Sequence, residues 1–286
     1  MTTVCDPCWK IPDSSSWKDR SILRKPGKSD YTSPKAYRPI ALLNTIGKLI
    51  DSILARRISY VTEVYQLLPR THIGGRQARL PEHALHMIIE KIYKAWYEPE
   101  PRVASLLLLD VLGAFDNVSH ARLLHNLRKR RIDEKTVRWI ASFLSDRTTT
   151  LSFDSYTSEE CKTTTGIPQG SPLSPILYLY YNADLIDLGN QEAHTMAVGY
   201  IDDIAIIRWG RTTSETCNGL ERTMQEANVW ARKHASVFAV EKFQLIHHIR
   251  KQQILGSDRG VQIGDTQVTA TPSIKYLGLT LDPGLR

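Results

Sequence analysis

The sequence has little cysteine and lacks any long apolar run. Only four cysteines occur among the 286 residues, which indicates a reducing compartment. No apolar run approaches the roughly 20 residues that cross a bilayer, and the first residues lack the apolar segment of a secretory signal. We therefore expect an intracellular protein, nuclear or cytoplasmic, with no membrane partner.

Internal repeats and long linkers are also missing, so 286 residues make one large domain or two modest ones. Cys5 and Cys8 have zinc-knuckle spacing, but no second Cys or His pair follows closely. We predict no zinc site there.

The composition is that of an ordinary globular protein, with 42% hydrophobic and 23% charged residues. The net charge of +7 favours a polyanionic partner, although many basic proteins bind no nucleic acid. Two basic stretches stand out, residues 24–28 and 128–131. Solvated surface is the default interpretation of such clusters, and phosphate contact is the alternative.

Residues 197–207 read Ala-Val-Gly-Tyr-Ile-Asp-Asp-Ile-Ala-Ile-Ile, two apolar strands with Asp202 and Asp203 in the link between them. Adjacent carboxylates in an apolar hairpin are costly unless a cation neutralises them, and Mg²⁺ is one candidate. On this stretch alone, an ordinary hairpin turn is an equally good explanation.

Apolar residues recur at helical spacing over 46–61 and again over 85–96, and both stripes predict core. The loop 68–79 joins these helices, with paired glycines and three arginines that suit phosphate recognition. Residues 1–37 look irregular. The polar stretch 146–165 predicts a hairpin.

Residues 103–109 form an apolar run that predicts a central strand buried on both faces, and Asp110 follows it directly. Gly166 and Gly170 flank Gln169, and Ser171 with Pro172 predicts the start of a helix that continues to about Leu188.

The last third of the chain predicts a helix over 214–235, then Lys242 before a strand over 243–249. A hairpin over 261–268 turns at 264–265, and residues 274–281 form a final strand.

Asp110 and the Asp202–Asp203 pair each lie at the end of an apolar strand. If the strands are neighbours, three carboxylates meet and raise one another's pKa unless cations lie between them. Two Mg²⁺ ions would satisfy them and serve in-line phosphoryl transfer.

These stretches resemble reverse transcriptases. Residues 108–116, 166–172 and 200–203 are similar to motifs A, B and C of that family, in order and spacing, and specifically to its non-LTR (LINE-type) branch. Further similarities are to the two fingers motifs, the motif D lysine and the primer grip, at residues 37–44, 75–79, 242 and 275–278. The resemblance covers about residues 20–282.

The resemblance implies an α+β fold: right-hand polymerase fingers and palm, with an antiparallel palm sheet backed by helices. It implies a single domain over 1–286, with 1–105 mainly fingers and 106–286 palm, of which 118–165 is partly fingers. The chain ends where a thumb is expected, and no endonuclease precedes the fingers. We therefore expect a thumbless fragment of a larger element or a decaying copy, with doubtful processivity.

The resemblance also implies an RNA-directed DNA polymerase that uses an RNA template, a DNA primer, dNTPs and two Mg²⁺ ions, which Mn²⁺ can replace. It leaves the oligomeric state open. Asp110, Asp202 and Asp203 would bind metal, and Lys242 would protonate pyrophosphate. The nucleotide would contact Lys25, Arg38, Phe115 as the sugar gate, Gln169 and Gly170. The primer or template would contact Arg76, Arg79, Tyr200, Ile201, Lys275, Tyr276 and Gly278.

Ile201 stands where the branch mostly carries Ala, so we expect altered efficiency or fidelity. Leu80, Pro81 and Leu112 also depart from the family pattern, at the fingers and the rim of the site. Two alternatives remain open: a catalytically silent nucleic-acid-binding remnant, and a two-metal nuclease. The nuclease leaves the Gln169 loop and the Phe115 gate without a purpose.

Overall fold

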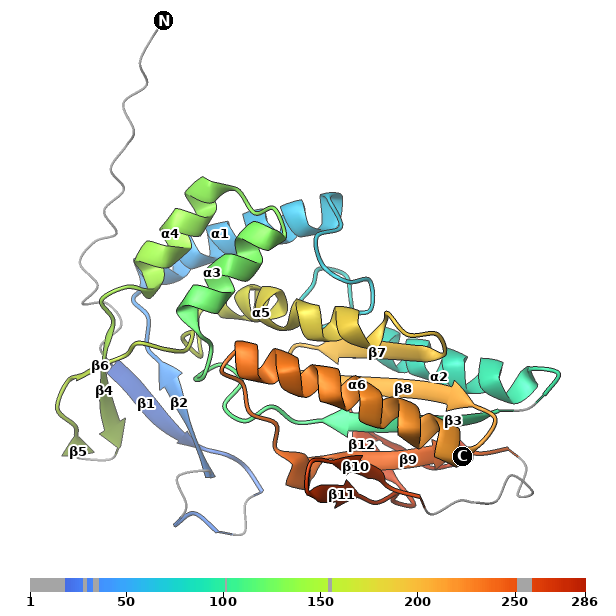
Figure 1. Ribbon diagram of the computed structural model, residues 1–286. Coiled ribbons are helices and arrows are strands. Elements are labelled where there is room, and N and C mark those ends of the chain that lie inside the picture. Colours follow the sequence, from blue (N-terminus) through green and yellow to red (C-terminus); the bar gives the residue numbers. More distant parts are fainter. Residues whose placement is uncertain (1–18, 28–29, 33–35, 101, 154–155, 251–258) are drawn as a thin grey trace, which may run out of the picture.

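The computed structural model describes residues 19–27, 30–32, 36–100, 102–153, 156–250 and 259–286. Cys5, Cys8 and Lys28 lie outside these ranges. A four-stranded sheet and a five-stranded sheet organise the described chain, and helices pack around the four-stranded one (Figure 1). None of the helices in the described ranges combines the length and apolarity that a bilayer crossing requires.

The central sheet has four strands in the order β7-β8-β3-β9. Every neighbouring pair is antiparallel, as the resemblance implied for the palm. The strands are β3 (Val103–Leu109), β7 (Thr195–Tyr200), β8 (Asp203–Gly210) and β9 (Gln244–His248).

Strand β3 is buried along its whole length because helices cover both faces of the sheet. Leu106 and Leu108 belong to the core beneath α2 (Pro81–Tyr97). Leu107 and Leu109 belong to the core that α5 (Ser174–Gly189) and α6 (Thr213–Lys233) close on the other side. Two covered faces explain why this strand is apolar at every position except the buried Ser105, instead of alternating.

The five-stranded sheet, called the second sheet below, joins segments that are far apart in sequence. Its members are β1 (Asp19–Arg24), β2 (Tyr37–Ala41), β4 (Thr148–Phe153), β5 (Tyr156–Thr157) and β6 (Cys161–Lys162). The hairpin predicted over 146–165 is present. The prediction of irregular structure over 1–37 was wrong for β1, whose short segment gains its partners from β2 and from distant β4.

Helix α1 (Thr45–Val64) begins at Asn44, whose side chain accepts a hydrogen bond from the Gly47 N–H. Its apolar stripe was predicted to be core, and the structure corrects this. Ile46, Leu49 and Ile53 are 68%, 60% and 54% exposed, while Ile58 is buried. Periodicity marks an apolar face but does not say whether another element covers it.

Of the two further helices, α3 (His120–Lys129) packs against both α4 (Glu134–Leu144) and α5. Ser119 and Asp133 cap them by accepting hydrogen bonds from the Arg122 and Thr136 N–H groups.

The chain continues from β9 through two small hairpins, β10 (Val261–Ile263) with β11 (Thr266–Val268), and β12 (Ile274–Tyr276) with β13 (Leu279–Leu281). The first hairpin was predicted. The second corrects the prediction of one strand over 274–281, because Leu277 and Gly278 turn the chain with φ of 48° and 89°.

Candidate active site

Asp110, Asp202 and Asp203 lie at the same end of the central sheet. Asp110 directly follows β3, and Leu109 pairs with Ile204 on β8. Tyr200 pairs with Asp203, which leaves Ile201 and Asp202 as the two-residue turn of the hairpin. The two apolar strands are therefore neighbours, and their antiparallel register brings the three acids together.

The acids at the turn oppose one another's ionisation. Burial raises the pKa of Asp203 to about 6, and the charges of Asp202 and Asp110 add to the rise. Burial also raises the pKa of Asp202, and the charge of Asp110 contributes. Their side chains still reach solvent, so surrounding protein atoms disfavour the charge without sealing the site.

Lys242 supplies positive charge next to these acids. It ends the 3₁₀ helix η3 (Val240–Lys242), and its Nζ lies 3.1 Å from Asp110 Oδ1. Backbone hydrogen bonds fix the two segments, from Ala239 N–H to the Asp110 carbonyl and from Leu112 N–H to the Val237 carbonyl. The predicted position of Lys242, just before β9, is confirmed.

The donor set fits a divalent cation in chemistry, because three oxygen-donor side chains that repel one another gain from a cation between them. They are not preassembled: in the described ranges, no three His, Cys, Asp or Glu side chains are grouped closely enough to hold a metal ion. Lys242 instead partly neutralises Asp110.

The Gln169 loop joins three parts of the chain. Gln169 Nε2 donates to Asp116 Oδ2 at 3.0 Å, and its carbonyl accepts from the Ala41 N–H of β2. Gly170 has a φ of 115°, and a Cβ there would lie 2.8 Å from the Ala41 carbonyl oxygen, so only glycine fits this approach.

The helix after this loop begins later than predicted, at Ser174 with Leu173 as its N-cap. Ser171 was expected to cap it. The Ser171 Oγ accepts a hydrogen bond from the Leu173 N–H. The same hydroxyl donates a hydrogen bond of 2.5 Å to the buried carboxylate of Asp51. Ser171 therefore ties the loop to α1.

Phe115 stacks on Tyr178 of α5, with 5.1 Å between ring centroids and 15° between ring planes. Burial raises the pKa of Tyr178, and the charge of Asp202 adds to it, which relates this aromatic pair to the acids. Sequence analysis missed Tyr178 because it lies within an apolar helical run and carries no motif.

Asn182 is a second residue that sequence analysis missed. It is fully buried on α5, and its Nδ2 donates to the Ile201 carbonyl at 2.8 Å. Ile201 has a φ of 58°, an unusual value for a β-branched residue. The available signal was a single amide side chain directly after the apolar and aromatic run 176–181.

Lys25 and Arg38 come from the second sheet, which contains β1 and β2. Lys25 follows β1, and its N–H donates to the Ala36 carbonyl. Arg38 on β2 is exposed, and its positive charge opposes the rise in the Asp202 pKa. Arg38 therefore acts electrostatically on the acidic turn.

Arg76 and Arg79 converge on Glu63 of α1. The Arg76 guanidinium donates to both Glu63 carboxylate oxygens at 2.6 and 2.7 Å, and to the carbonyls of Pro69 and His72. Its side chain is 2% exposed, so it faces the protein interior. Arg79 is more exposed and lies 3.4 Å from Glu63.

Tyr276 is buried in the β12–β13 hairpin. Burial raises the pKa of its hydroxyl, and the Asp203 charge adds to the rise, so the hairpin lies within electrostatic range of the acids. Lys275 is exposed on the same strand, and Gly278 is in the turn. Tyr200 is half-buried at the end of β7.

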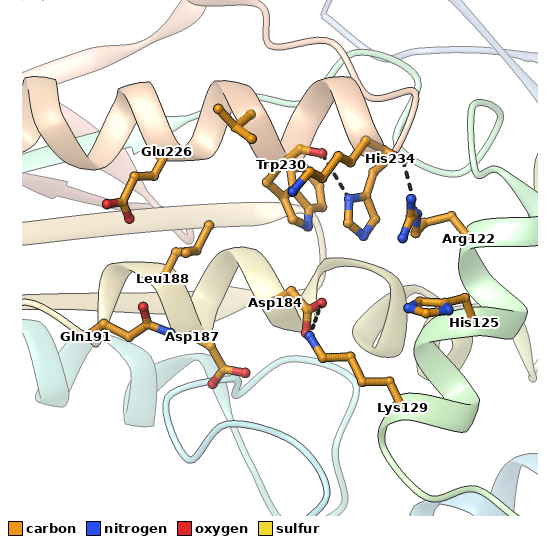
Figure 2. A pocket seen from close by; sticks show the side chains of 12 residues that line it. Arg122, His125, Lys129, Asp184, Asp187, Leu188, Gln191, Glu226, Trp230 and His234 are labelled. Atoms are coloured by element: carbon orange, nitrogen blue, oxygen red, sulfur yellow. Dashed lines mark hydrogen bonds and ion pairs between the residues drawn. The ribbon is translucent and has the colours of Figure 1, made fainter.

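A separate pocket of about 490 Å³ lies between α3, α5 and α6 (Figure 2). None of the predicted site residues lines it. Part of the basic cluster 128–131 is there, where Lys129 pairs with Asp184 at 2.8 Å. Arg130 pairs with Asp184 and Asp187. These ion pairs indicate a structural role for both residues. Lys129 is exposed as expected, but the Arg130 side chain is only 12% exposed, which corrects the expectation of a solvated surface there.

A known family model matches nearly the whole range of residues that the structure describes. The family model for reverse transcriptase (RNA-dependent DNA polymerase) matches residues 23–281. The chain belongs to the reverse transcriptase family. Enzymes of this family generally use divalent metals, which agrees with the acidic character of the turn.

This reverse transcriptase domain is of the non-LTR retrotransposon type. It is 28% identical over 277 residues to the RNA-directed DNA polymerase from mobile element jockey of Drosophila melanogaster, covering 93% of this chain and 29% of that protein. A probable RNA-directed DNA polymerase from transposon X-element of the same species is 28% identical over 263 residues, with 92% and 28% covered. The domain thus spans less than a third of these relatives.

Solved telomerase structures share the fold of the domain. Telomerase from Candida tropicalis, with a fragment of telomeric RNA, superposes with a TM-score of 0.62 at 12% identity, covering 94% of this chain and 44% of that one. Telomerase from Candida albicans gives 0.59 at 12% identity, with 94% and 45% covered. At this identity the likeness concerns the fold alone.

Proposed function

We propose that this domain is an RNA-directed DNA polymerase, which transfers nucleotides from dNTPs to the 3′-hydroxyl of a DNA primer on an RNA template. The observation that carries the proposal is the meeting of Asp110, Asp202 and Asp203 at one sheet end, with Lys242 beside them. The family match supports it.

In the proposed reaction, the primer 3′-oxygen attacks the α-phosphorus of the dNTP. A new P–O bond forms, the bond to the β-phosphate bridging oxygen breaks, and pyrophosphate leaves. Lys242 donates a proton to pyrophosphate, while the hydroxyl proton leaves to solvent. Asp110, Asp202 and Asp203 would hold two Mg²⁺, or Mn²⁺ in their place. Bound ions would lower the pKa of the hydroxyl and neutralise the leaving charge.

The proposed nucleotide contacts come from fingers and palm together. Lys25 and Arg38 bind the triphosphate, as a point charge and a planar fork. Phe115, held flat against Tyr178, lies beneath the sugar and excludes a 2′-hydroxyl. Gln169 and Gly170 contact the nucleotide, and the hydrogen bond from Gln169 to Asp116 holds the Gln169 side chain in place.

The proposed primer and template contacts use Tyr200, Ile201, Lys275, Tyr276 and Gly278, with Arg79 in the fingers. For Arg76 we propose a supporting role through Glu63, because its guanidinium is already engaged. The assignment of 1–105 to the fingers also remains a proposal, with the qualification that α2 packs against the palm sheet. Action inside the cell, in nucleus or cytoplasm, is part of the same proposal.

The test is primer extension on an RNA template with Mg²⁺, comparing wild-type protein with Asp202→Asn. We expect the variant to lose on the order of 10³-fold in rate. Asp265→Asn, an exposed acid in the β10–β11 turn, is the control and should extend normally. Equal extension by wild type and Asp202→Asn would falsify the assignment.

A second candidate function is nucleic-acid binding without catalysis. Two observations favour it. Among the described residues, the three acids are not close enough together to hold a metal ion, and Lys242 already pairs with Asp110. A remnant of this kind would bind RNA with a steep salt dependence and incorporate no dNTP. Templated incorporation that depends on Asp202 would eliminate this candidate.

A further inference from the structure

Residues 71–75, here called the edge segment, run along the outer side of β7. The Ile73 N–H donates to the Gly199 carbonyl at 2.7 Å, and the Gly199 N–H donates to the Thr71 carbonyl at 3.0 Å. His72 and Gly199 form a parallel bridge. Since β7 is the outermost strand of the central sheet, the edge segment completes that edge next to the acidic turn.

Gly74 brings the edge segment into backbone contact with the turn. A Cβ on Gly74 would lie 2.6 Å from the Ile201 nitrogen and 2.7 Å from the Tyr200 carbonyl carbon. Both are backbone atoms, which cannot move aside as the end of a long side chain can. Any side chain at position 74 must therefore displace Tyr200 and Ile201, the residues that precede Asp202.

Gly75 differs, although it is the next residue. A Cβ there would lie 3.4 Å from Leu179 Cδ1 and 3.7 Å from Ile201 Cγ1, both ordinary contacts with side chains. Its φ is 71°, so alanine at this position strains the backbone of the loop. An added methyl group at 75 thus costs loop stability without reaching the backbone of the turn.

Two further residues hold the hairpin in place, His72 from the edge segment itself and Asn182 from α5. His72 is fully buried against Gly199, where a Cβ would lie 2.8 Å from His72 Cδ2. Asn182 of α5 donates to the Ile201 carbonyl at 2.8 Å. Ile201 keeps its φ of 58° within this enclosure, and such a conformation persists only where its surroundings over-determine it.

We infer that Gly74 and Asn182 are positioning residues that fix the Ile201–Asp202 turn from two sides and so set where the Asp202 carboxylate stands relative to Asp110. The inference rests on the proposed function for its catalytic consequence. Neither residue touches substrate. Their effect passes through the backbone of the turn.

The test compares Gly74→Ala with Gly75→Ala, the same methyl group one residue apart. For Gly74→Ala we expect kcat to fall about 10²-fold, because a displacement near 1 Å at reacting groups costs that much. The Mg²⁺ concentration for half-maximal rate should rise about tenfold, as for other residues that orient metal ligands. Gly75→Ala should keep the wild-type Mg²⁺ midpoint. A variant that merely contained less folded protein would lose rate without moving this midpoint.

Two measurements need no catalysis. Amide hydrogen exchange should become at least about tenfold faster across residues 197–207 in Gly74→Ala and not in Gly75→Ala. Mn²⁺ binding to the protein alone, followed by electron paramagnetic resonance of the free ion, should weaken about tenfold in Gly74→Ala. Asn182→Ala adds no atoms and cannot clash, so it decides the question if Gly74→Ala does not fold. It should shift exchange and Mn²⁺ affinity in the same direction.

The outcomes separate the two ideas. The inference is overturned if both Gly74→Ala and Asn182→Ala keep the wild-type exchange rates, Mn²⁺ affinity and Mg²⁺ midpoint while primer extension still depends on Asp202. Extension that does not depend on Asp202 would overturn the proposed function, and exchange and Mn²⁺ binding would still test the positioning role.

Discussion

Lys242 and Asp110, 132 residues apart in sequence, form an ion pair of 3.1 Å at the end of the central sheet. Both side chains are about half exposed, so the pair adds less than about 1 kcal/mol to stability. Its importance is therefore chemical, because it places an ammonium group next to the acids that the proposed reaction uses.

We predict that Lys242→Ala lowers the extension rate about 10²-fold, the usual contribution of a general acid, and leaves the thermal midpoint nearly unchanged. Single-turnover kinetics and calorimetry measure the two quantities. Lys135→Ala, at an exposed position of α4, is the control. A large stability loss with an unchanged rate would mean that Lys242 has a structural role only.

A second prediction concerns the sugar gate. Phe115→Val should reduce the preference for dNTP over rNTP by about 10- to 100-fold, because the flat ring stacked on Tyr178 no longer fills the space beneath the sugar. The measurement is kcat/KM for matched dNTP and rNTP. Tyr178→Phe keeps the stacked ring and removes a hydroxyl that has no partner among the described residues, so it should keep the preference. Unchanged selectivity in Phe115→Val contradicts the gate.

A third prediction follows from Asp51, which is buried between α1 and the Gln169 loop. Burial raises its pKa to about 6, against the opposing effects of Ser171 and Arg147. Since the folded pKa exceeds the unfolded one, this group favours the folded state below about pH 4, and that contribution is lost as pH rises through 6. Asp51→Asn should therefore be more stable than wild type above pH 6, by roughly 1–3 kcal/mol.

Denaturant unfolding at pH 4.5 and pH 7.5 measures this difference, which should shrink at the lower pH. Asp133→Asn is a control of opposite sign. Burial would raise the Asp133 pKa, but the hydrogen bonds from Thr136 and the charge of Arg57 outweigh it and lower the pKa. The free energy of unfolding of this variant should be about 1 kcal/mol lower than that of wild type at neutral pH, and the difference should diminish in acid. A wild type that is more stable than Asp51→Asn at pH 7.5 would refute the prediction.

The fourth prediction separates Arg76 from Arg79. Arg76→Lys should destabilise the fold by about 2–4 kcal/mol, because an ammonium cannot reproduce the two-pronged contact with Glu63 in a buried site. Arg79→Ala should cost less than about 1 kcal/mol. RNA binding at two salt concentrations should weaken in Arg79→Ala, with a shallower salt slope. If only Arg76→Lys weakens RNA binding, the proposed template contact belongs to Arg76.

The sequence alone determined the central strands and the acids at their ends. The run 103–109 and the strands of the hairpin 197–207 are mostly apolar because helices cover both faces of the sheet, and that pattern is local. Antiparallel pairing then required Asp110, Asp202 and Asp203 to share one sheet end. The order of the motifs was enough to indicate the family.

Only the tertiary structure decided which faces and edges find a partner. The apolar stripe of α1 is half exposed, β1 exists because distant β4 pairs with it, and Arg76 turns inward to Glu63. The edge segment reaches Gly199 from more than a hundred residues away, and Asn182 reaches Ile201 from a separate helix. Periodicity reports which residues avoid water. Contacts between distant segments depend on how whole elements pack, and a single sequence carries no local signal for them.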